Sequence, residues 1–279
     1  MNMVGFMDNF FVLLLLGFLV GTFGTLIGAG GGFLLVPVLL ITHKNMQPNT
    51  VTAISIAVVA ANAISGSVAY ARSGRIDYKA GLLFAAFTIP GSIAGVFLVN
   101  YIPKHAFNIV FGVLLIVLAA FLFITNKERT VTDPAKKKTG IGFRHHDLTD
   151  NNGETFSYTY NQTIGIVISI LVGFISPLLG IGGGIIHVPA MVQWLQFPVY
   201  IATATSHFIL AIMSTVSVVV HIFQGSYNDE HVLKMLVALC VGVIPGAQLG
   251  AYISHRVDTT LIIRVLAICL ALVGLRILL

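Results

Sequence analysis

The chain has 279 residues, of which 57% are hydrophobic and only 9% carry a charge. Soluble domains carry about 25% charged residues, so the composition excludes an ordinary soluble protein and indicates an integral membrane protein. We interpret the net charge of +5 as a determinant of orientation in the membrane. The expected surroundings are therefore a lipid bilayer, and no nucleic-acid partner is expected.

Apolar segments of the first half cover 10–42, 51–71, 78–99 and 105–125. The first has no basic region before it and no clear cleavage site, so we expect a retained span rather than a signal peptide. As one straight helix it would be about 50 Å long, well beyond a hydrocarbon core of about 30 Å. The helix must therefore break, and the stretch GAGGGFLLVP at 28–37 is the expected position.

Residues 127–162 form the long polar stretch of the sequence. Its basic residues are Lys127, Arg129, Lys136, Lys137, Lys138 and Arg144. Because cytoplasmic segments of membrane proteins are enriched in Lys and Arg, we expect a hydrophilic cytoplasmic connector, and we assign it no chemistry. The adjacent His145 and His146 are a possible metal-binding pair, but a solvated loop pair is the commoner case.

Apolar segments of the second half cover 163–195, 201–223, 232–252 and 259–278. Three motifs of the first half recur there in the same order: GAGGGFLLVP at 28–37 and GIGGGIIHVP at 180–189, TAIS at 52–55 and TATS at 203–206, IPGSIAG at 89–95 and IPGAQLG at 244–250. Chance is a poor explanation for all three. Such internal repeats are a hallmark of secondary transporters.

These patterns predict an all-α integral membrane protein with about eight transmembrane segments. The segments form two pseudo-symmetric repeats of four, and the first helix of each repeat is broken at its glycine-rich motif. The predicted divisions are a first repeat at 1–126, the connector at 127–162 and a second repeat at 163–279. If the chain doubles back at each break, the repeats are inverted, which we favour. If it continues across the membrane, they are parallel.

The glycines suggest a binding site. Glycine reaches backbone angles closed to other residues, and a helix that begins there presents free N–H groups and a positive dipole end, which suit an anion. The candidate substrate-binding glycines are Gly30, Gly31, Gly32, Gly182, Gly183 and Gly184. The alternative is close packing of helices, for which small residues are common in membranes.

Hydroxyl side chains follow each break and complete the candidate site: Thr52, Ser55, Thr203, Thr205 and Ser206. They either donate to an oxyanion or bond back to helix carbonyls. His187 and His207 are further candidates that would couple transport to protons, and Arg264 is either a counter-charge or an interfacial anchor. No Asp or Glu lies deep in an apolar span, which argues against a cation site.

The paired GxGGG…P motifs, with TAIS or TATS and IPG…G after them, resemble the TauE/SafE sulfite exporter family, also called the TSUP family, over nearly the whole chain. The resemblance implies a multi-pass inner-membrane permease, often an exporter, for small anions such as sulfite, sulfoacetate or other sulfonates. It implies no enzymatic activity and no cofactor.

Other functions remain open at this point. They are a passive anion channel, a permease for another small organic anion, and a membrane metalloenzyme built on His187, His207 and His221. Against the enzyme stand the missing HExxH motif and the missing buried carboxylate. The sequence leaves the exact substrate, the direction of transport and the oligomeric state open.

Overall fold

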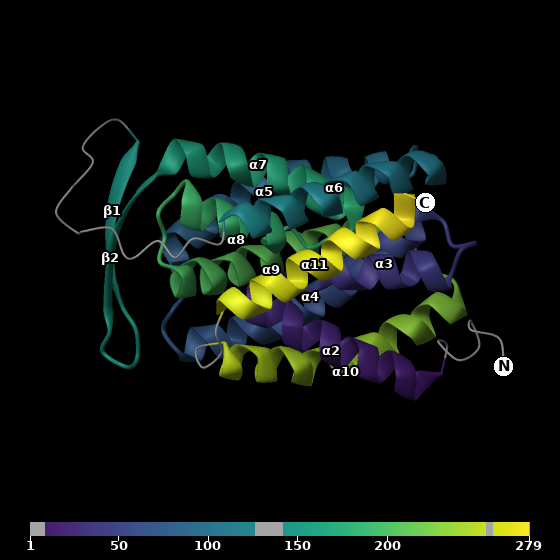
Figure 1. Cartoon of the computed structure of the whole chain (residues 1–279), viewed down its shortest axis with the longest axis horizontal. Coiled ribbons are helices and arrows are strands. Elements are labelled where there is room, and N and C mark those ends of the chain that lie inside the picture. The colour runs from purple at the N-terminus through teal and green to yellow at the C-terminus, as the bar shows by residue number, and fades with distance from the viewer. Residues whose placement is uncertain (1–8, 126–141, 255–258, 279) are drawn as a thin grey trace.

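The computed structural model describes residues 9–125, 142–254 and 259–278, the last helix with only part of its side chains. The chain is built mainly from helices (Figure 1). Their bounds are α2 Phe10–Ile27, α3 Gly32–Thr42, α4 Pro48–Arg72, α5 Tyr78–Val99, α6 Lys104–Thr125, α7 Gln162–Leu179, α8 Gly184–Gln193, α9 Val199–Phe223, α10 Glu230–Ile253 and α11 Thr259–Leu278.

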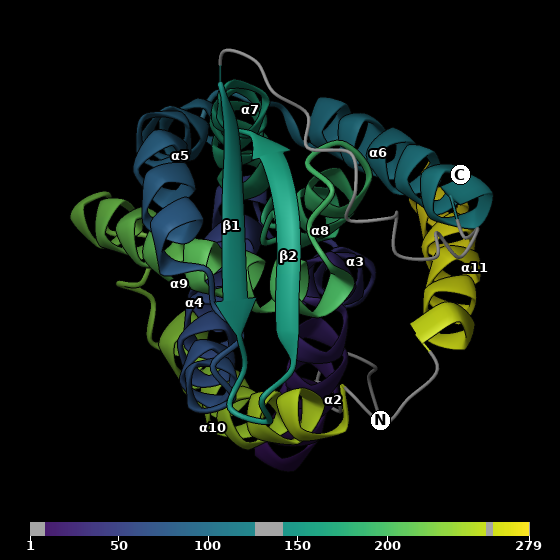
Figure 2. The ribbon, with the colours of Figure 1, turned by 90° about the vertical axis from the view of Figure 1, so that its left-hand side faces the viewer.

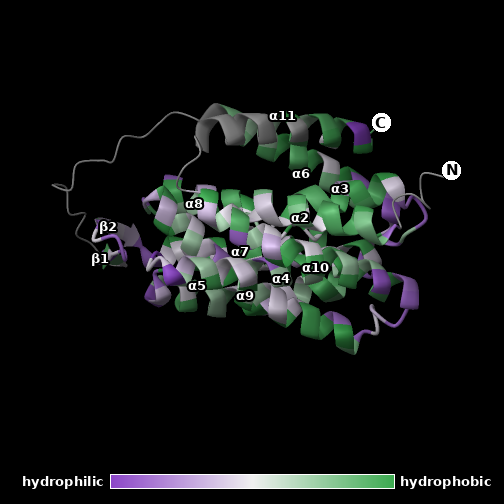
Figure 3. Ribbon diagram, turned by 90° about the horizontal axis from the view of Figure 1, so that it is seen from below, coloured by the Kyte–Doolittle hydropathy of each residue, from purple (hydrophilic) through white to green (hydrophobic). Residues whose placement is uncertain are grey.

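Seven of the described helices are long and apolar enough to cross a membrane: α2, α4, α5, α6, α7, α9 and α10. Large apolar side chains on them are exposed, among them Leu15, Val117 and Leu171, and hydrophilic residues gather toward the two ends of the bundle (Figure 3). So much exposed apolar surface is stable only against lipid. The chain is therefore a multi-pass membrane protein, while the eighth predicted span, α11, stays a prediction.

Both predicted helix breaks are present, and the chain doubles back at each. α2 ends at Ile27, and α3 then leads back to a short loop from which α4 begins, at the end of the bundle where α2 starts (Figure 1). The second break lies between α7 and α8. After α8, the ring of Phe197 packs against the ring of Tyr158, with centroids 4.6 Å apart. Tyr158 lies in the strand that leads into α7. α3 and α8 therefore return toward the ends from which α2 and α7 came.

Helix pairing joins the two halves of the chain. α2 packs along α10, α5 along α7, α4 along α9 and α6 along α11. Glycines let the backbones of the first two pairs touch: Gly246 of α10 lies against the backbone of Phe18, and Gly91 of α5 against that of Phe174. Small residues commonly allow this close approach in membranes.

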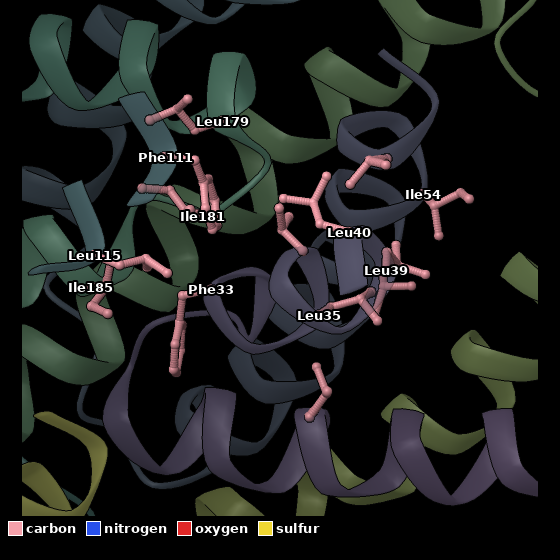
Figure 4. Packing of buried hydrophobic residues seen from close by; sticks show 14 of the residues in the cluster. Phe33, Leu35, Leu39, Leu40, Ile54, Phe111, Leu115, Leu179, Ile181 and Ile185 are labelled. Atoms are coloured by element: carbon pink, nitrogen blue, oxygen red, sulfur yellow. The ribbon is translucent and has the colours of Figure 1, made fainter. Parts of the chain in front are cut away.

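The largest core cluster surrounds the first break and the start of α8 (Figure 4). Phe33 and Leu35 of α3, Ile54 of α4 and Ile185 of α8 are almost completely buried there, with Ile181 between α7 and α8. Apolar side chains from both halves thus enclose the glycine-rich segments and keep lipid away from their irregular backbone, as membrane proteins require.

The connector contains a structured element that the sequence analysis did not anticipate. Strands β1 (Phe143–Thr149) and β2 (Thr155–Asn161) pair antiparallel, with His146 opposite Tyr158. The hairpin lies across one end of the bundle (Figure 2). It adds strands to a fold expected to be all-helical. The basic residues of the connector from Lys127 to Lys138 lie outside the described residues.

Candidate functional site

The glycines at the two breaks are required by their backbone angles. Positive φ values occur at Gly28 (79°), Gly30 (77°) and Gly31 (85°) in the first break. The second break repeats them at Gly180 (70°), Gly182 (81°) and Gly183 (61°). Because an L side chain is disfavoured at these angles, the paired motifs are explained by the turn that each break makes.

The two breaks also lie against each other. A Cβ added to Gly32 would collide with the backbone carbonyl oxygen of Gly180, and one added to Gly184 with that of Gly28. The two contacts are reciprocal, since each joins the start of one short helix to the end of the long helix in the other half. The structure thus brings the predicted glycines of both halves together, in tight contact.

Two of the predicted hydroxyls hold this contact. Ser55 Oγ donates to the carbonyl oxygen of Gly180 at 2.5 Å, and Ser206 Oγ donates to that of Gly28 at 3.4 Å. These carbonyls belong to the residues that end α7 and α2, where the last carbonyls of a helix lack helical partners. The hydroxyls therefore replace helical hydrogen bonds, reciprocally, across the halves.

The predicted threonines have different surroundings. Thr52 packs against Gly180, and Thr203 packs against Gly28. The hydroxyl of Thr52 bonds back to the carbonyl of Asn49 at 3.0 Å. Thr205 lies toward the hairpin end of the bundle, where its hydroxyl accepts from the backbone N–H of Asp77 at 3.0 Å. Thr52 and Thr203 thus line the breaks, and Thr205 does not.

The short helices begin at the breaks with N–H groups available. In α3 the first helical hydrogen bonds are donated by Leu34 and Leu35 to the Gly31 carbonyl, and in α8 Ile186 and His187 donate to the Gly183 carbonyl, while the Gly184 N–H is already engaged by the Gly182 carbonyl at 2.6 Å. The N–H groups before these residues lie at the positive end of the helix dipole. In this conformation each helix start faces the backbone of the opposite break.

The predicted histidines flank the breaks on different sides. His187 is buried between Ser169, at 3.4 Å, and the ring of Phe84. His207 is buried against the ring of Tyr70, with centroids 5.5 Å apart. The side chain of Arg264 lies outside the described residues. Within the described parts of the chain, no group of three or more His, Cys, Asp or Glu residues is placed to hold a metal.

A buried polar network at the hairpin was missed by the sequence analysis. Asp77 caps α5 by accepting from Ala80 N, and its other oxygen lies 2.8 Å from His146 Nδ1 and 2.7 Å from the Tyr158 hydroxyl, which donates to it. His146 is therefore engaged with a carboxylate and is not simply a solvated loop residue. Burial, followed by the nearby Asp77 charge, raises the pKa of Tyr158 above its ordinary range.

A second anchor joins the hairpin turn to the loop before α5. Arg75 forms an ion pair with Asp150 at 3.1 Å, and the carboxylate is fully buried. Burial alone would raise the pKa of Asp150, but the N–H of Glu154, the Arg75 guanidinium and the N–H of Asn152 together lower it below the usual value. The alternating aromatic residues at 156, 158 and 160 were the available signal for this strand.

Comparison with known proteins gives the family. The sulfite exporter TauE/SafE family model matches residues 13–277. Similar curated proteins include the probable membrane transporter protein YunE of Bacillus subtilis, 34% identical over 95% of this chain and 96% of its own length. The probable membrane transporter protein MJ0441 of Methanocaldococcus jannaschii is 25% identical over 88% of this chain and 87% of its own length.

No solved structure matches the chain. The family match covers the apolar segments of both halves and the two breaks between them. The relatives are named as transporters, and with the seven apolar spans they identify this protein as a membrane transporter rather than an enzyme. The chain therefore belongs to the TauE/SafE sulfite exporter family.

Proposed function

We propose that the protein is a secondary transporter that exports small sulfur-containing anions, such as sulfite or organosulfonates. The observation that carries the proposal is the meeting of two helix starts among described helices that carry no carboxylate in their interior. In the described helices, Asp and Glu occur only at Glu230, the first residue of α10. A cation carrier would need acidic side chains inside the membrane, whereas helix starts favour anions.

The arrangement of helices supports two inverted repeats. In each half, one long helix, a break and a short returning helix are followed by three further helices, and α2 and α7 start from opposite ends of the bundle (Figure 1). With α11 as a span, each half then has three full crossings after a helix pair that enters the membrane and returns. Because the anchored hairpin and the basic residues Arg72 and Arg75 share one end of the bundle, we assign that end to the cytoplasm.

The proposed mechanism is alternating access at the breaks. In the present conformation the two breaks are in contact, so an anion reaches the helix starts only when they separate. Backbone N–H groups of α3 and α8 would then bind its oxygens. Histidines near the breaks supply a route for coupling the movement to protons, with His187 and His207 as the residues involved.

Flux into proteoliposomes tests the proposal. We expect saturable uptake of sulfite or a sulfonate, with sulfoacetate, taurine, thiosulfate and sulfate as competitors and the pH gradient either present or absent. Gly183→Leu should abolish the flux, because its φ is positive and Ser176 and Val172 fill the space beside it. Gly153→Leu is the matched control, since this glycine also has a positive φ but has no atom within 4 Å.

The outcomes separate the candidate functions. Accelerated exchange by substrate on the opposite side of the membrane would identify a carrier, and flux that neither saturates nor exchanges would identify a channel instead. If the folded parent moves none of these anions, the proposed substrate class is wrong.

A further inference from the structure

A buried polar cluster lies beside the first break, on one side of the molecule only. We call it the Asn62 cluster; it consists of Thr25 of α2, Asn62 and Tyr70 of α4, and His207 of α9, all buried. Asn62 and Tyr70 are eight residues apart on α4, with Gly66 midway between them. Residues spaced by four share one face of a helix, so this face of α4 is polar where it meets α2 and α9.

Contacts within the cluster fix the positions of its members. Thr25 Oγ1 donates to Asn62 Oδ1 at 2.8 Å, and the Tyr70 hydroxyl donates to the Thr25 carbonyl at 2.9 Å. The His207 ring lies edge-on to Tyr70. Gly66 leaves room for that ring, since a Cβ there would lie 2.7 Å from His207 Cδ2.

Three polar atoms of the cluster have no partner among the described residues: Asn62 Nδ2 and both ring nitrogens of His207, all on fully buried side chains. A buried unpaired group costs about 1–3 kcal/mol. Three such atoms in one place therefore point to a ligand with polar atoms of its own.

The unpaired amide is directed at the first break. Asn62 Nδ2 lies 2.9 Å from the position of a Cβ on Gly24, and Gly31 N lies 2.5 Å from that same position. The second half has no equivalent amide. Asn62 lies ten residues after Thr52, and the corresponding position, ten residues after Thr203, is Met213. The polar cluster therefore belongs to the first break only.

A cavity of about 390 Å³ lies on the far side of Tyr70, at the hairpin end of the bundle. Tyr70, Arg72, Arg75, Asn151, Asn152 and Gln248 form part of its wall. Arg75 is neutralised by Asp150, while Arg72 is exposed and gives the opening a positive charge. Tyr70 belongs to both the cavity wall and the Asn62 cluster, and so connects the two.

We propose that a small oxyanion enters through this cavity, passes Tyr70 and binds at the Asn62 cluster beside the start of α3. Asn62 Nδ2 supplies amide donors, and His207 Nε2 donates in one neutral tautomer or in the protonated ring. An oxyanion offers several acceptor oxygens to such donors. The inference rests on the proposed function and places the anion to one side of the two breaks.

The test compares sulfite flux in proteoliposomes with sulfite-dependent thermal stabilisation in detergent. Asn62→Leu and His207→Leu should each lower kcat/KM for sulfite at least tenfold and remove the stabilisation. Asn62→Ser removes the amide without adding bulk. It replaces Asn62→Leu in both assays if the leucine variant does not fold. His221→Gln is the matched control, because this buried α9 histidine also has an unpaired Nε2 but contacts Tyr227, outside the cluster.

Each result decides the inference. If the cluster variants fold and transport sulfite within twofold of the parent, the Asn62 cluster does not bind the anion, although the proposed function stands. If the parent neither moves nor is stabilised by sulfite, the proposed substrate is wrong and the oxyanion site falls with it. An equal loss of sulfite flux in His221→Gln would also overturn the assignment. It would mean that transport depends on any buried histidine of α9 and not on the Asn62 cluster.

Discussion

The contact between the two breaks predicts a specific weakness at Gly32 and Gly184. Neither residue has a positive φ, so alanine is compatible with the backbone and the substitution tests space alone. In each case the new Cβ meets a backbone carbonyl, at Gly180 or at Gly28, which cannot rotate away. The breaks must therefore separate by about 1 Å to reach ordinary contact distance. Such overpacking costs about 1–3 kcal/mol.

Thermal unfolding of the purified protein in detergent measures this cost. The chain has one tryptophan, Trp194 at the end of α8, so its fluorescence reports on the helix after the second break. A loss of 1 kcal/mol lowers the midpoint by about 2–4 °C for a chain near this size. We expect a decrease of several degrees for each variant. Gly112→Ala is the comparison, with a smaller decrease expected, because its nearest atoms belong to the side chain of Leu278 and the nearest backbone atom, Gly274 O, is 3.1 Å away.

The double variant gives a sharper criterion. Gly32 and Gly184 lie on the two sides of one contact, so the separation forced by the first alanine makes room for the second. The double variant should lose less free energy of unfolding than the sum of the two single losses, by at least about 0.5 kcal/mol. If the single variants unfold at the temperature of the parent, or if their costs add, the breaks are not held in tight contact and the reasoning fails.

Three further predictions concern the hydroxyls and the hairpin. Ser55→Ala leaves the Gly180 carbonyl unpaired and should cost about 1–3 kcal/mol, more than Ser206→Ala, whose bond is longer; equal midpoints would contradict this. Because the pKa of Asp150 is lowered in the folded state, its stabilisation of the hairpin should be present above the unfolded value of about 3.9 and be lost as the pH falls below it. Hydrogen exchange of β1 and β2 should show this loss in the parent, and Asp150→Asn should abolish the pH dependence. Tyr158→Phe removes a donor to the buried Asp77 and should speed exchange in both strands, whereas Tyr160→Phe, the same change at a β2 residue whose hydroxyl does not bond to Asp77, should not.

Sequence alone predicted the helix breaks because their cause is local. A glycine at positive φ is required whatever packs around it, so Gly28 to Gly32 and Gly180 to Gly184 were recognisable in isolation. The need for a break has a similar cause, since a straight helix over 10–42 is too long for the membrane, whereas the doubling back was only the favoured one of two alternatives. These features depend on backbone geometry and length, which a sequence displays directly.

Partners that lie far apart in the chain could not be predicted. Ser55 was expected to face a substrate, but its hydroxyl donates to Gly180, 125 residues away. Asp77 lies just before an apolar segment in the sequence, and nothing there indicates that it binds the hairpin through Tyr158. Both contacts depend on the packing of the two halves, and no local pattern encodes that packing. The role of the remaining candidates in binding stays a prediction.

The pairing of α2 with α10 has a consequence for biosynthesis. The two helices are separated by about 200 residues, which take on the order of 10–40 s to synthesise at about 5–20 residues per second. During that interval the glycine face of α2, including Gly17 and Gly21, has no α10 against which to pack. The glycine face of α2 therefore stays in the bilayer without its native partner and can contact other helices until nearly the whole chain has been inserted.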